Sequence, residues 1–203
     1  MIDLSQSIPL GTGAHRSCYL HPDNKNLCIK VLHDVTKSEL KGIKNEMRYY
    51  NHIQGYLKDW SGIPRFHGTV ETNMGIGYVF DLITDFDGTP SVTLEDMLET
   101  CDTPEKAQKI IDLILALKKY IRDNHILTIT MNPHNVLCRR ISETQCVPVI
   151  CDNLGRSSFL PWSHWFQSIG DNSQQKRWER FIKLPLVVDF LERFNINGRE
   201  LIA

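Results

Sequence analysis

Two glycines and a lysine near the N-terminus could together hold a phosphate group. Gly11 and Gly13 could let backbone N–H groups approach phosphate oxygens, because no Cβ stands between them. Lys30 follows in the apolar run 27–32, where a buried ammonium group needs a partner. The alternatives are an ordinary hairpin turn at the glycines and a lysine on the solvent face of an edge strand. No Gly-Lys-Ser/Thr follows the glycines, which excludes a Walker-type loop, and Arg16 at the third glycine position argues against a dinucleotide-binding fingerprint.

A carboxylate on the next predicted element could pair with Lys30. Glu46 stands beside Met47, which belongs to the apolar stripe of a helix predicted over residues 36–58. A Lys30–Glu46 pair would place the lysine to hold an anionic ligand such as a diphosphate. Glu39 is the alternative partner, and either glutamate could instead be a solvated helix carboxylate.

An asparagine and an aspartate further along the chain could share a divalent cation. Asn135 precedes one predicted short strand and Asp152 follows the next, so their oxygen atoms could meet at a cation such as Mg²⁺. The alternatives are a turn residue at position 135 and a helix cap or Asx-turn at position 152.

Two halves that differ in predicted secondary structure must position these side chains. The first half is predicted to form strands around one helix, and the second half is predicted to be mainly helical with a pair of short strands. The strands are predicted at 17–20, 27–32, 66–70, 77–83, 136–140 and 147–151, and helices at 36–58, from Thr93, from Thr103-Pro104 and in three pieces from Pro161 to near Phe194. Residues 84–92 are rich in turn formers and are predicted to link a unit at 1–83 to a unit at 93–203.

Composition bounds the class of protein. The 203 residues carry 23 Lys and Arg against 24 Asp and Glu, and this balance argues against a protein that works by binding nucleic-acid backbone or an anionic membrane surface. The N-terminus lacks the pattern of a signal peptide, and the apolar runs are too short to span a membrane. The six cysteines have no metal-ligand spacing and are predicted to be free thiols in a reducing compartment, which indicates the cytoplasm.

The order of these features resembles the protein-kinase fold. Residues 27–30 match the V-A-I-K motif, residues 128–135 match the catalytic loop H-R-D-L-x-x-x-N in frame, and residues 152–155 match D-F-G loosely. The resemblance implies an α+β, two-lobed, kinase-like fold, with a small N-lobe sheet plus one helix and a truncated, mainly helical C-lobe. It also implies that ATP and Mg²⁺ bind between the lobes.

Site roles follow from that resemblance. Lys30, Asn135 and Asp152 would be the catalytic residues, and Asn135 and Asp152 would hold the metal. The residues expected to bind the nucleotide are Gly11, Gly13, Lys30, Glu46, Asp81 and Ile83, the last two at the position of a kinase hinge.

The whole chain also resembles a bacterial family, the PhoP regulatory network proteins of the YrbL type. The segments that carry this resemblance are 59–65, 67–72, 85–88 and 151–153. It implies a cytoplasmic kinase-like protein whose gene responds to a magnesium- and acid-sensing two-component system.

Several positions depart from the kinase pattern. Thr130 stands where the catalytic loop has its aspartate, and a hydroxyl cannot accept a proton as a carboxylate does. Asn132 replaces a lysine that assists transfer in many kinases. His134 or Asp123 could substitute as the base, and the alternative is that each is a structural residue. Only 48 residues follow Gly155 and they contain no A-P-E motif, so the peptide-docking helices are expected to be missing.

Two functions remain open at this stage. The first is an atypical kinase acting on a small non-peptide acceptor. The second is an inactive, nucleotide-sensing pseudokinase that regulates a protein partner through an aromatic cluster of Trp162, Trp165, Phe166 and Trp178, unless these side chains fill the core instead. A structural protein that kept only the fold is a third alternative, and the basic run 176–180 reads as a solvated helix face rather than a nucleic-acid site.

Overall fold

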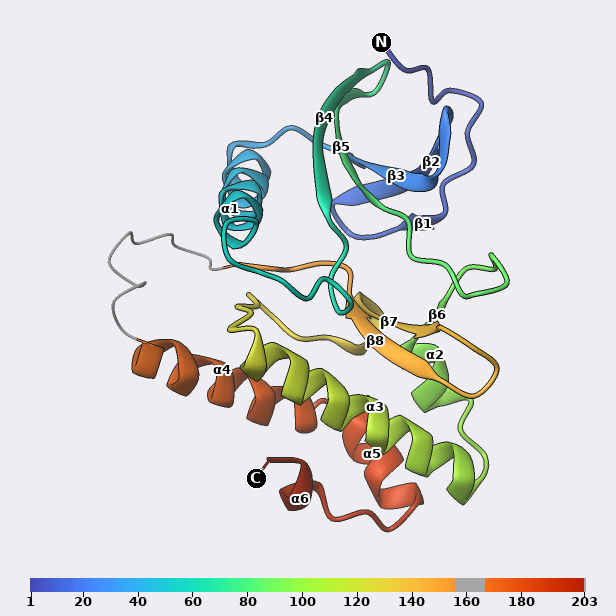
Figure 1. Ribbon diagram of the computed structural model, residues 1–203, viewed down its shortest axis with the longest axis vertical. Helices are drawn as coiled ribbons and strands as arrows, with labels where there is room; N and C mark the ends of the chain where they lie inside the picture. The colour runs from blue at the N-terminus through green and yellow to red at the C-terminus, as the bar shows by residue number, and fades with distance from the viewer. Residues whose placement is uncertain (156–166, 203) are drawn as a thin grey trace.

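The computed structural model describes residues 1–155 and 167–202 and shows a mixed α+β architecture (Figure 1). A five-stranded antiparallel sheet and helix α1 lie at one end, and a three-stranded antiparallel sheet lies among the remaining helices at the other end. The strands are β1 (Gly11–Thr12), β2 (Arg16–His21), β3 (Asn24–Leu32), β4 (Phe66–Thr72), β5 (Gly75–Asp81), β6 (Val92–Thr93), β7 (Val136–Arg140) and β8 (Cys146–Ile150). The helices are α1 (Lys37–Ile53), α2 (Leu94–Glu99), α3 (Pro104–Asp123), η1 (Pro133–Asn135), α4 (Gln167–Ile182), α5 (Pro185–Arg193) and α6 (Gly198–Ile202).

Strand β3 lies in the middle of the five-stranded sheet, whose order is β1-β2-β3-β5-β4. Lys30 pairs with Cys18 on β2 and with Tyr78 on β5. Because side chains alternate along a strand, Lys30 faces the opposite side of the sheet from Ile29, which is fully buried near Leu4 in a small core of its own. The lysine therefore lies on the face that looks toward α1.

Helix α1 begins where the sequence predicts it and ends earlier. Thr36 caps the helix in a capping box with Glu39, so this glutamate is engaged at the helix start. The helix ends at Ile53, whereas the apolar rhythm predicted that it continues to residue 58. Glu46 lies on the buried face and is 6% exposed.

The second half is built on α3 and the three-stranded sheet β6-β7-β8. Thr93 and Thr103 cap α2 and α3 through side-chain hydrogen bonds, and Pro104 opens α3, as predicted. Register pairs Val136 with Ile150, so the residues just before β7 and just after β8 lie side by side. This pairing brings the segments that contain Asn135 and Asp152 together.

The predicted linker is held against the second sheet. Asp85 accepts hydrogen bonds from the backbone N–H of Arg140 at 3.0 Å and from the Ser91 hydroxyl at 2.6 Å, and it is only 7% exposed. The Arg140 guanidinium also pairs with Asp85, and with Asp87 at 2.6 Å. Residues 84–91 thus form a fixed loop on β7 rather than a free tether.

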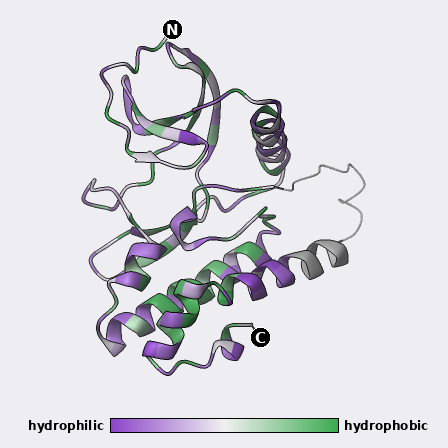
Figure 2. Cartoon of the chain, turned by 180° about the vertical axis from the view of Figure 1, so that it is seen from behind, coloured by the Kyte–Doolittle hydropathy of each residue, from purple (hydrophilic) through white to green (hydrophobic). Residues whose placement is uncertain are grey.

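One large hydrophobic cluster runs through both halves. It extends from Cys28 and Tyr50 in the first half to Phe190 and Leu201 in the second. Figure 2 shows hydrophobic residues gathered where α3 lies beside its neighbouring helices. No helix in the described part of the chain has the length and apolar character needed to cross a bilayer.

Candidate functional site

Three charged side chains that the sequence singled out meet between the two sheets. Lys30 comes from β3, Glu46 from α1 and Asp152 from the segment that follows β8. A fourth, Arg16 at the start of β2, joins them. The side chains of Arg16 and Glu46 are 14% and 8% exposed and that of Asp152 is 25% exposed, so the cluster is largely shielded from water.

Arg16 bridges the two carboxylates. Its Nη1 lies 2.9 Å from Glu46 Oε2, and its Nη2 donates to Glu46 Oε1 at 3.2 Å. The same guanidinium donates through Nε to Asp152 Oδ2 at 3.2 Å and through Nη2 to Asp152 Oδ1. The predicted Lys30–Glu46 pair is therefore replaced by an Arg16–Glu46 pair, because the forked guanidinium reaches both carboxylates at once.

Lys30 binds a backbone oxygen instead. Its Nζ donates to the Cys151 carbonyl at 2.5 Å and lies 4.9 Å from the centre of the Phe80 ring. Burial lowers the pKa of Lys30, but the negative charge of Asp152, together with smaller contributions from Cys151 and Cys28, outweighs it, and the net pKa is raised. The ammonium group therefore stays charged and remains available to an anionic ligand.

Asp152 is held ionised by the cations around it. Burial raises the pKa of this carboxyl, but the charges of Lys30 and Arg16 and the hydrogen bonds from Arg16 and Asn153 together lower it by more, so that the net shift is downward. Asp152 Oδ1 also accepts from the N–H of Asn153 at 2.6 Å, and Asn153 itself adopts a left-handed backbone with φ 61°. This tight turn aims the carboxylate toward β2 and β3.

Asn135 lies at the adjoining position. Its carbonyl accepts from the N–H of Cys151 at 2.9 Å, which places it next to Asp152 across the two chain segments. Its side chain makes no hydrogen bond to any described residue and is half-buried. Asn135 and Asp152 thus offer the oxygen ligands that suit Mg²⁺, which takes few protein ligands and completes its shell with phosphates and water. The described residues contain no cluster of three or more His, Cys, Asp or Glu that could hold a metal without such help.

The glycine segment forms a turn at the edge of this cluster. Gly11 pairs with Cys18 in the sheet, and the N–H of Gly13 donates to the Arg16 carbonyl at 2.9 Å. A Cβ at Gly11 would meet nothing within 4 Å, so packing within the chain does not require glycine there. Space is left in which a ligand could approach the backbone.

The two residues expected at the hinge differ in whether their backbone N–H is free to bind a base. The N–H of Asp81 already donates to the Arg65 carbonyl at 3.1 Å, and its carboxylate binds His67 at 2.7 Å. The N–H of Ile83 donates to no acceptor among the described residues. Of the two, the geometry favours Ile83 for a backbone hydrogen bond to a base.

Comparison of the sequence with known proteins shows the family to which the chain belongs. A family model described as "PhoP regulatory network protein YrbL" matches residues 2–185. The chain belongs to this family. The "Uncharacterized protein YrbL" of Escherichia coli (strain K12) and that of Shigella flexneri are each 46% identical to it over 200 residues, which cover 98% of this chain and 95% of each relative. The family resemblance inferred from the sequence is confirmed.

The segment 127–130, part of which the sequence analysis compared with a kinase catalytic loop, is held by backbone hydrogen bonds in this YrbL-family chain. Its Ile129 N–H donates to the Asn153 carbonyl at 2.7 Å, and the N–H of Leu127 donates to the Tyr49 hydroxyl at 2.7 Å. Thr130 is exposed. Neither expected substitute for the base points clearly to the cluster, because His134 lies 3.9 Å from Glu95 and Asp123 pairs with Lys119 on α3.

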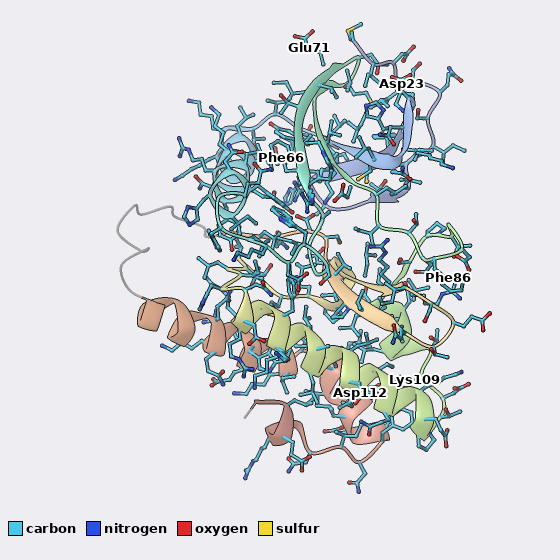
Figure 3. The ribbon with its side chains drawn as sticks, viewed as in Figure 1. Asp23, Phe66, Glu71, Phe86, Lys109 and Asp112 are labelled. Carbon is cyan, nitrogen blue, oxygen red and sulfur yellow. The ribbon has the colours of Figure 1, made fainter. Side chains whose placement is uncertain are left out.

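The aromatic residues expected to form a partner surface divide into two groups. Trp162, Trp165 and Phe166 lie outside the described residues. Trp178 is 3% exposed and donates through Nε1 to the Leu201 carbonyl at 2.7 Å, which makes it a core residue. On the opposite side of the molecule Phe66, labelled in Figure 3, belongs to an aromatic cluster with Tyr50 and Phe80, at ring distances of 6.0 and 5.2 Å.

The sequence reasoning missed two residues of this candidate site. Arg16 was noted only as the residue that breaks a glycine pattern, although an arginine at the start of a strand that lies near a buried helix glutamate is a candidate for an ion pair. Cys18 faces the same cluster, and the thiol's hydrogen bond with Cys28 is the first of several contacts that lower its pKa to about 7. Cys18 lies two residues after Arg16 on β2 and so shares its face of the sheet, which is the sequence signal that could have identified it.

Proposed function

We propose that this YrbL-family chain is an atypical kinase-like protein that binds ATP and Mg²⁺ between its two halves. The observation that carries the proposal is the convergence of Lys30, Glu46 and Asp152, which come from three distant segments, in one shielded charged cluster. The proposed fold is the two-lobed kinase-like arrangement, with residues 1–83 as N-lobe, 84–92 as linker and 93–203 as shortened C-lobe.

Each part of the proposed site has a group suited to its task. The turn at Gly11 and Gly13 would let the phosphates approach the backbone, Lys30 would bind phosphate oxygens, and Ile83 would hydrogen-bond the base. Asn135 and Asp152 would hold Mg²⁺, which when bound neutralises phosphate charge.

The exposed Thr130 limits the chemistry that the chain itself can perform. Without a carboxylate there, a proton acceptor would have to come from elsewhere, although general base help contributes only about 10²–10⁴-fold and phosphoryl transfer depends mainly on positioning and charge. Because only 48 residues follow Gly155 and they contain no A-P-E motif, we propose a small non-peptide acceptor. The family name connects the chain with a PhoP regulatory network, in which we place it as a cytoplasmic protein.

A second candidate is a pseudokinase that senses nucleotide and regulates a protein partner. Two observations favour it. Thr130 lacks the chemistry of a base, and the Arg16 guanidinium already occupies both oxygens of Asp152. Binding without transfer is the expected behaviour in that case.

A thermal shift assay tests nucleotide binding. A ligand present at 100 times its Kd and bound only to the folded state stabilises that state by about 2.7 kcal/mol. For a chain of this length, we expect Mg-ATP to raise Tm by about 5–10 °C. Lys30→Met and Asp152→Asn should each remove most of this ligand-induced shift, whereas Lys109→Met, on α3 (Figure 3), should keep it. An equal shift in all four proteins, or none in the wild type, contradicts the proposal.

Phosphoryl transfer then separates the two candidates. If the wild type binds Mg-ATP, radiolabelled γ-phosphate is followed with a panel of small hydroxyl and carboxyl acceptors. Label that moves to an acceptor and is lost in Asp152→Asn supports the kinase. Tight nucleotide binding without transfer across the panel supports the pseudokinase.

A further inference from the structure

Arg16 occupies the carboxylate that a metal would need. Its guanidinium donates to both Asp152 oxygens through Nε and Nη2, so each oxygen already faces a cation of the chain itself. The same group is fixed from behind by two contacts to Glu46, at 2.9 and 3.2 Å. Asn135, on the other side, makes no side-chain hydrogen bond to the described residues and has no such competitor.

We infer that Arg16 is a built-in cation that competes with Mg²⁺ for Asp152 and must leave this carboxylate when the metal binds. This inference rests on the proposed function for the identity of the metal site, and it adds how that site is regulated. In the state described here Arg16 neutralises Asp152. In the metal-bound state Arg16 keeps Glu46 and releases Asp152.

Charge and geometry make the two cations exclusive. Mg²⁺ requires ligand oxygens at about 2.0–2.1 Å in near-octahedral geometry, which leaves no room for a guanidinium on the same oxygen lone pairs. Two cations held on one carboxylate would also repel each other in a shielded site. In the metal-bound state Glu46 remains the partner of Arg16, because it is buried and already binds the guanidinium.

The released guanidinium has an obvious second acceptor. Arg16 follows the glycine turn, and the N–H of Gly13 is bonded to its carbonyl. A phosphate cradled at this turn would lie within reach of the free donors of Arg16, which suit phosphate oxygens in a bidentate manner. Metal and phosphate would therefore cooperate. The metal frees Arg16, and the phosphate gives it a new partner.

The experiment measures divalent-cation affinity directly. Mn²⁺ is titrated into the purified full chain as a paramagnetic stand-in for Mg²⁺, and free Mn²⁺ is read by electron paramagnetic resonance in the wild type and in Arg16→Gln. Because the variant has no guanidinium to displace from the Asp152 oxygens, we expect it to bind Mn²⁺ about tenfold or more tightly. Arg140→Gln is the matched control, since Arg140 also pairs with two carboxylates but lies on β7 beside the 84–91 loop.

Two further arms keep the test decisive. Arg16→Lys keeps a positive charge beside Glu46, so it is expected to disturb folding less than the glutamine variant. Since an ammonium cannot span both carboxylates, its Mn²⁺ affinity should fall between the other two. In the wild type, the Arg16 Nε–H signal in ¹⁵N NMR should shift when Mg²⁺ is added without nucleotide, because its hydrogen bond to Asp152 is lost.

The outcomes separate this inference from the proposed function. Equal or weaker Mn²⁺ binding in both Arg16 variants, or no binding in any protein, overturns the inference. Tighter binding in the variants without any response to ATP supports it and counts against nucleotide binding. A thermal shift with Mg-ATP together with unchanged Mn²⁺ affinity supports the proposed function alone.

Discussion

Arg16 and Lys30 carry the same charge on neighbouring strands, and their different shapes decide their partners. The guanidinium is a planar fork with five donors, which lets it bind Glu46 and Asp152 at once, whereas the ammonium of Lys30 is a point charge that satisfies the Cys151 carbonyl. Removing Arg16 would leave the shielded Glu46 carboxylate without its guanidinium partner and Asp152 with Lys30 as the remaining nearby cation. Exchange of the two side chains would therefore not preserve the cluster.

Cys18 provides a test of this electrostatic environment at the scale of one residue. A hydrogen bond with Cys28, and then the charges of Lys30 and Arg16, lower the pKa of its thiol to about 7. Since the thiolate is the reactive form, we expect iodoacetamide to label Cys18 first, at a rate that rises as the pH passes upward through about 7. Peptide mapping by mass spectrometry after short exposure measures this order.

Cys146 is the internal reference for that experiment. It is also half-exposed, but burial raises the pKa of its thiol to about 11. If Cys146 is labelled before Cys18 at neutral pH, the proposed influence of Lys30 and Arg16 on Cys18 is wrong. Cys18→Ser should remove the fast-labelled peptide and leave the slow one.

At the scale of elements, capping residues predicted where helices begin, whereas apolar periodicity did not predict where α1 ends. Thr36, Thr93 and Thr103 marked three helix starts correctly, because an N-cap side chain bonds the backbone locally. The end of α1 was misplaced because Leu57 is buried at 7% exposure although it lies beyond the helix. Leu57 is apolar because it is buried against the rest of the molecule, and its spacing therefore matched a helix that had already ended.

The candidate site, too, was predicted only in part. The apolar flanks of Lys30 and the helix stripe beside Glu46 predicted that these two residues face each other, and the resemblance to the kinase fold predicted that Asp152 lies nearby. They could not show that Arg16 takes the glutamate, since a pattern assigns a residue to a face but does not choose between two cations that share it. That choice depends on distances across segments far apart in the sequence.

Helix α1 and the 125–135 loop are joined by one hydroxyl. Tyr49 is buried and its hydroxyl accepts the N–H of Leu127 at 2.7 Å. Tyr49→Phe leaves this half-buried N–H without its acceptor, so we expect it to reduce the free energy of unfolding by about 1 kcal/mol. Urea denaturation followed by circular dichroism measures the change.

The neighbouring tyrosine is the matched control. Tyr50 is 1% exposed, and its hydroxyl makes no hydrogen bond to the described residues. Tyr50→Phe should therefore be neutral or slightly stabilising, because it removes a buried polar group that gains nothing. Equal losses in the two variants would show that the contact to Leu127 contributes nothing specific.

At the scale of the molecule, the two halves behave as one folded unit. The hydrophobic cluster is continuous between them, and backbone bonds cross the junction, including one from the Ile150 N–H to the Gly62 carbonyl at 2.8 Å. The Tyr120 hydroxyl on α3 donates to the Asp59 carbonyl at 2.7 Å. We therefore expect tryptophan fluorescence and far-UV circular dichroism to report one coincident unfolding transition.

Gly62 is the position at which this junction can be tested. A Cβ there would lie 2.5 Å from the Tyr120 ring, and the ring is fixed by its bond to Asp59, so Gly62→Ala must push α3 away from the first half. We expect a loss of about 1–3 kcal/mol in the free energy of unfolding, seen equally by both probes. Gly42→Ala on the exposed side of α1, where a Cβ meets nothing within 4 Å, should instead stabilise the protein by about 0.5–1 kcal/mol. Two separate transitions in Gly62→Ala, one unchanged from the wild type, would mean that the halves fold independently and that the junction does not couple them.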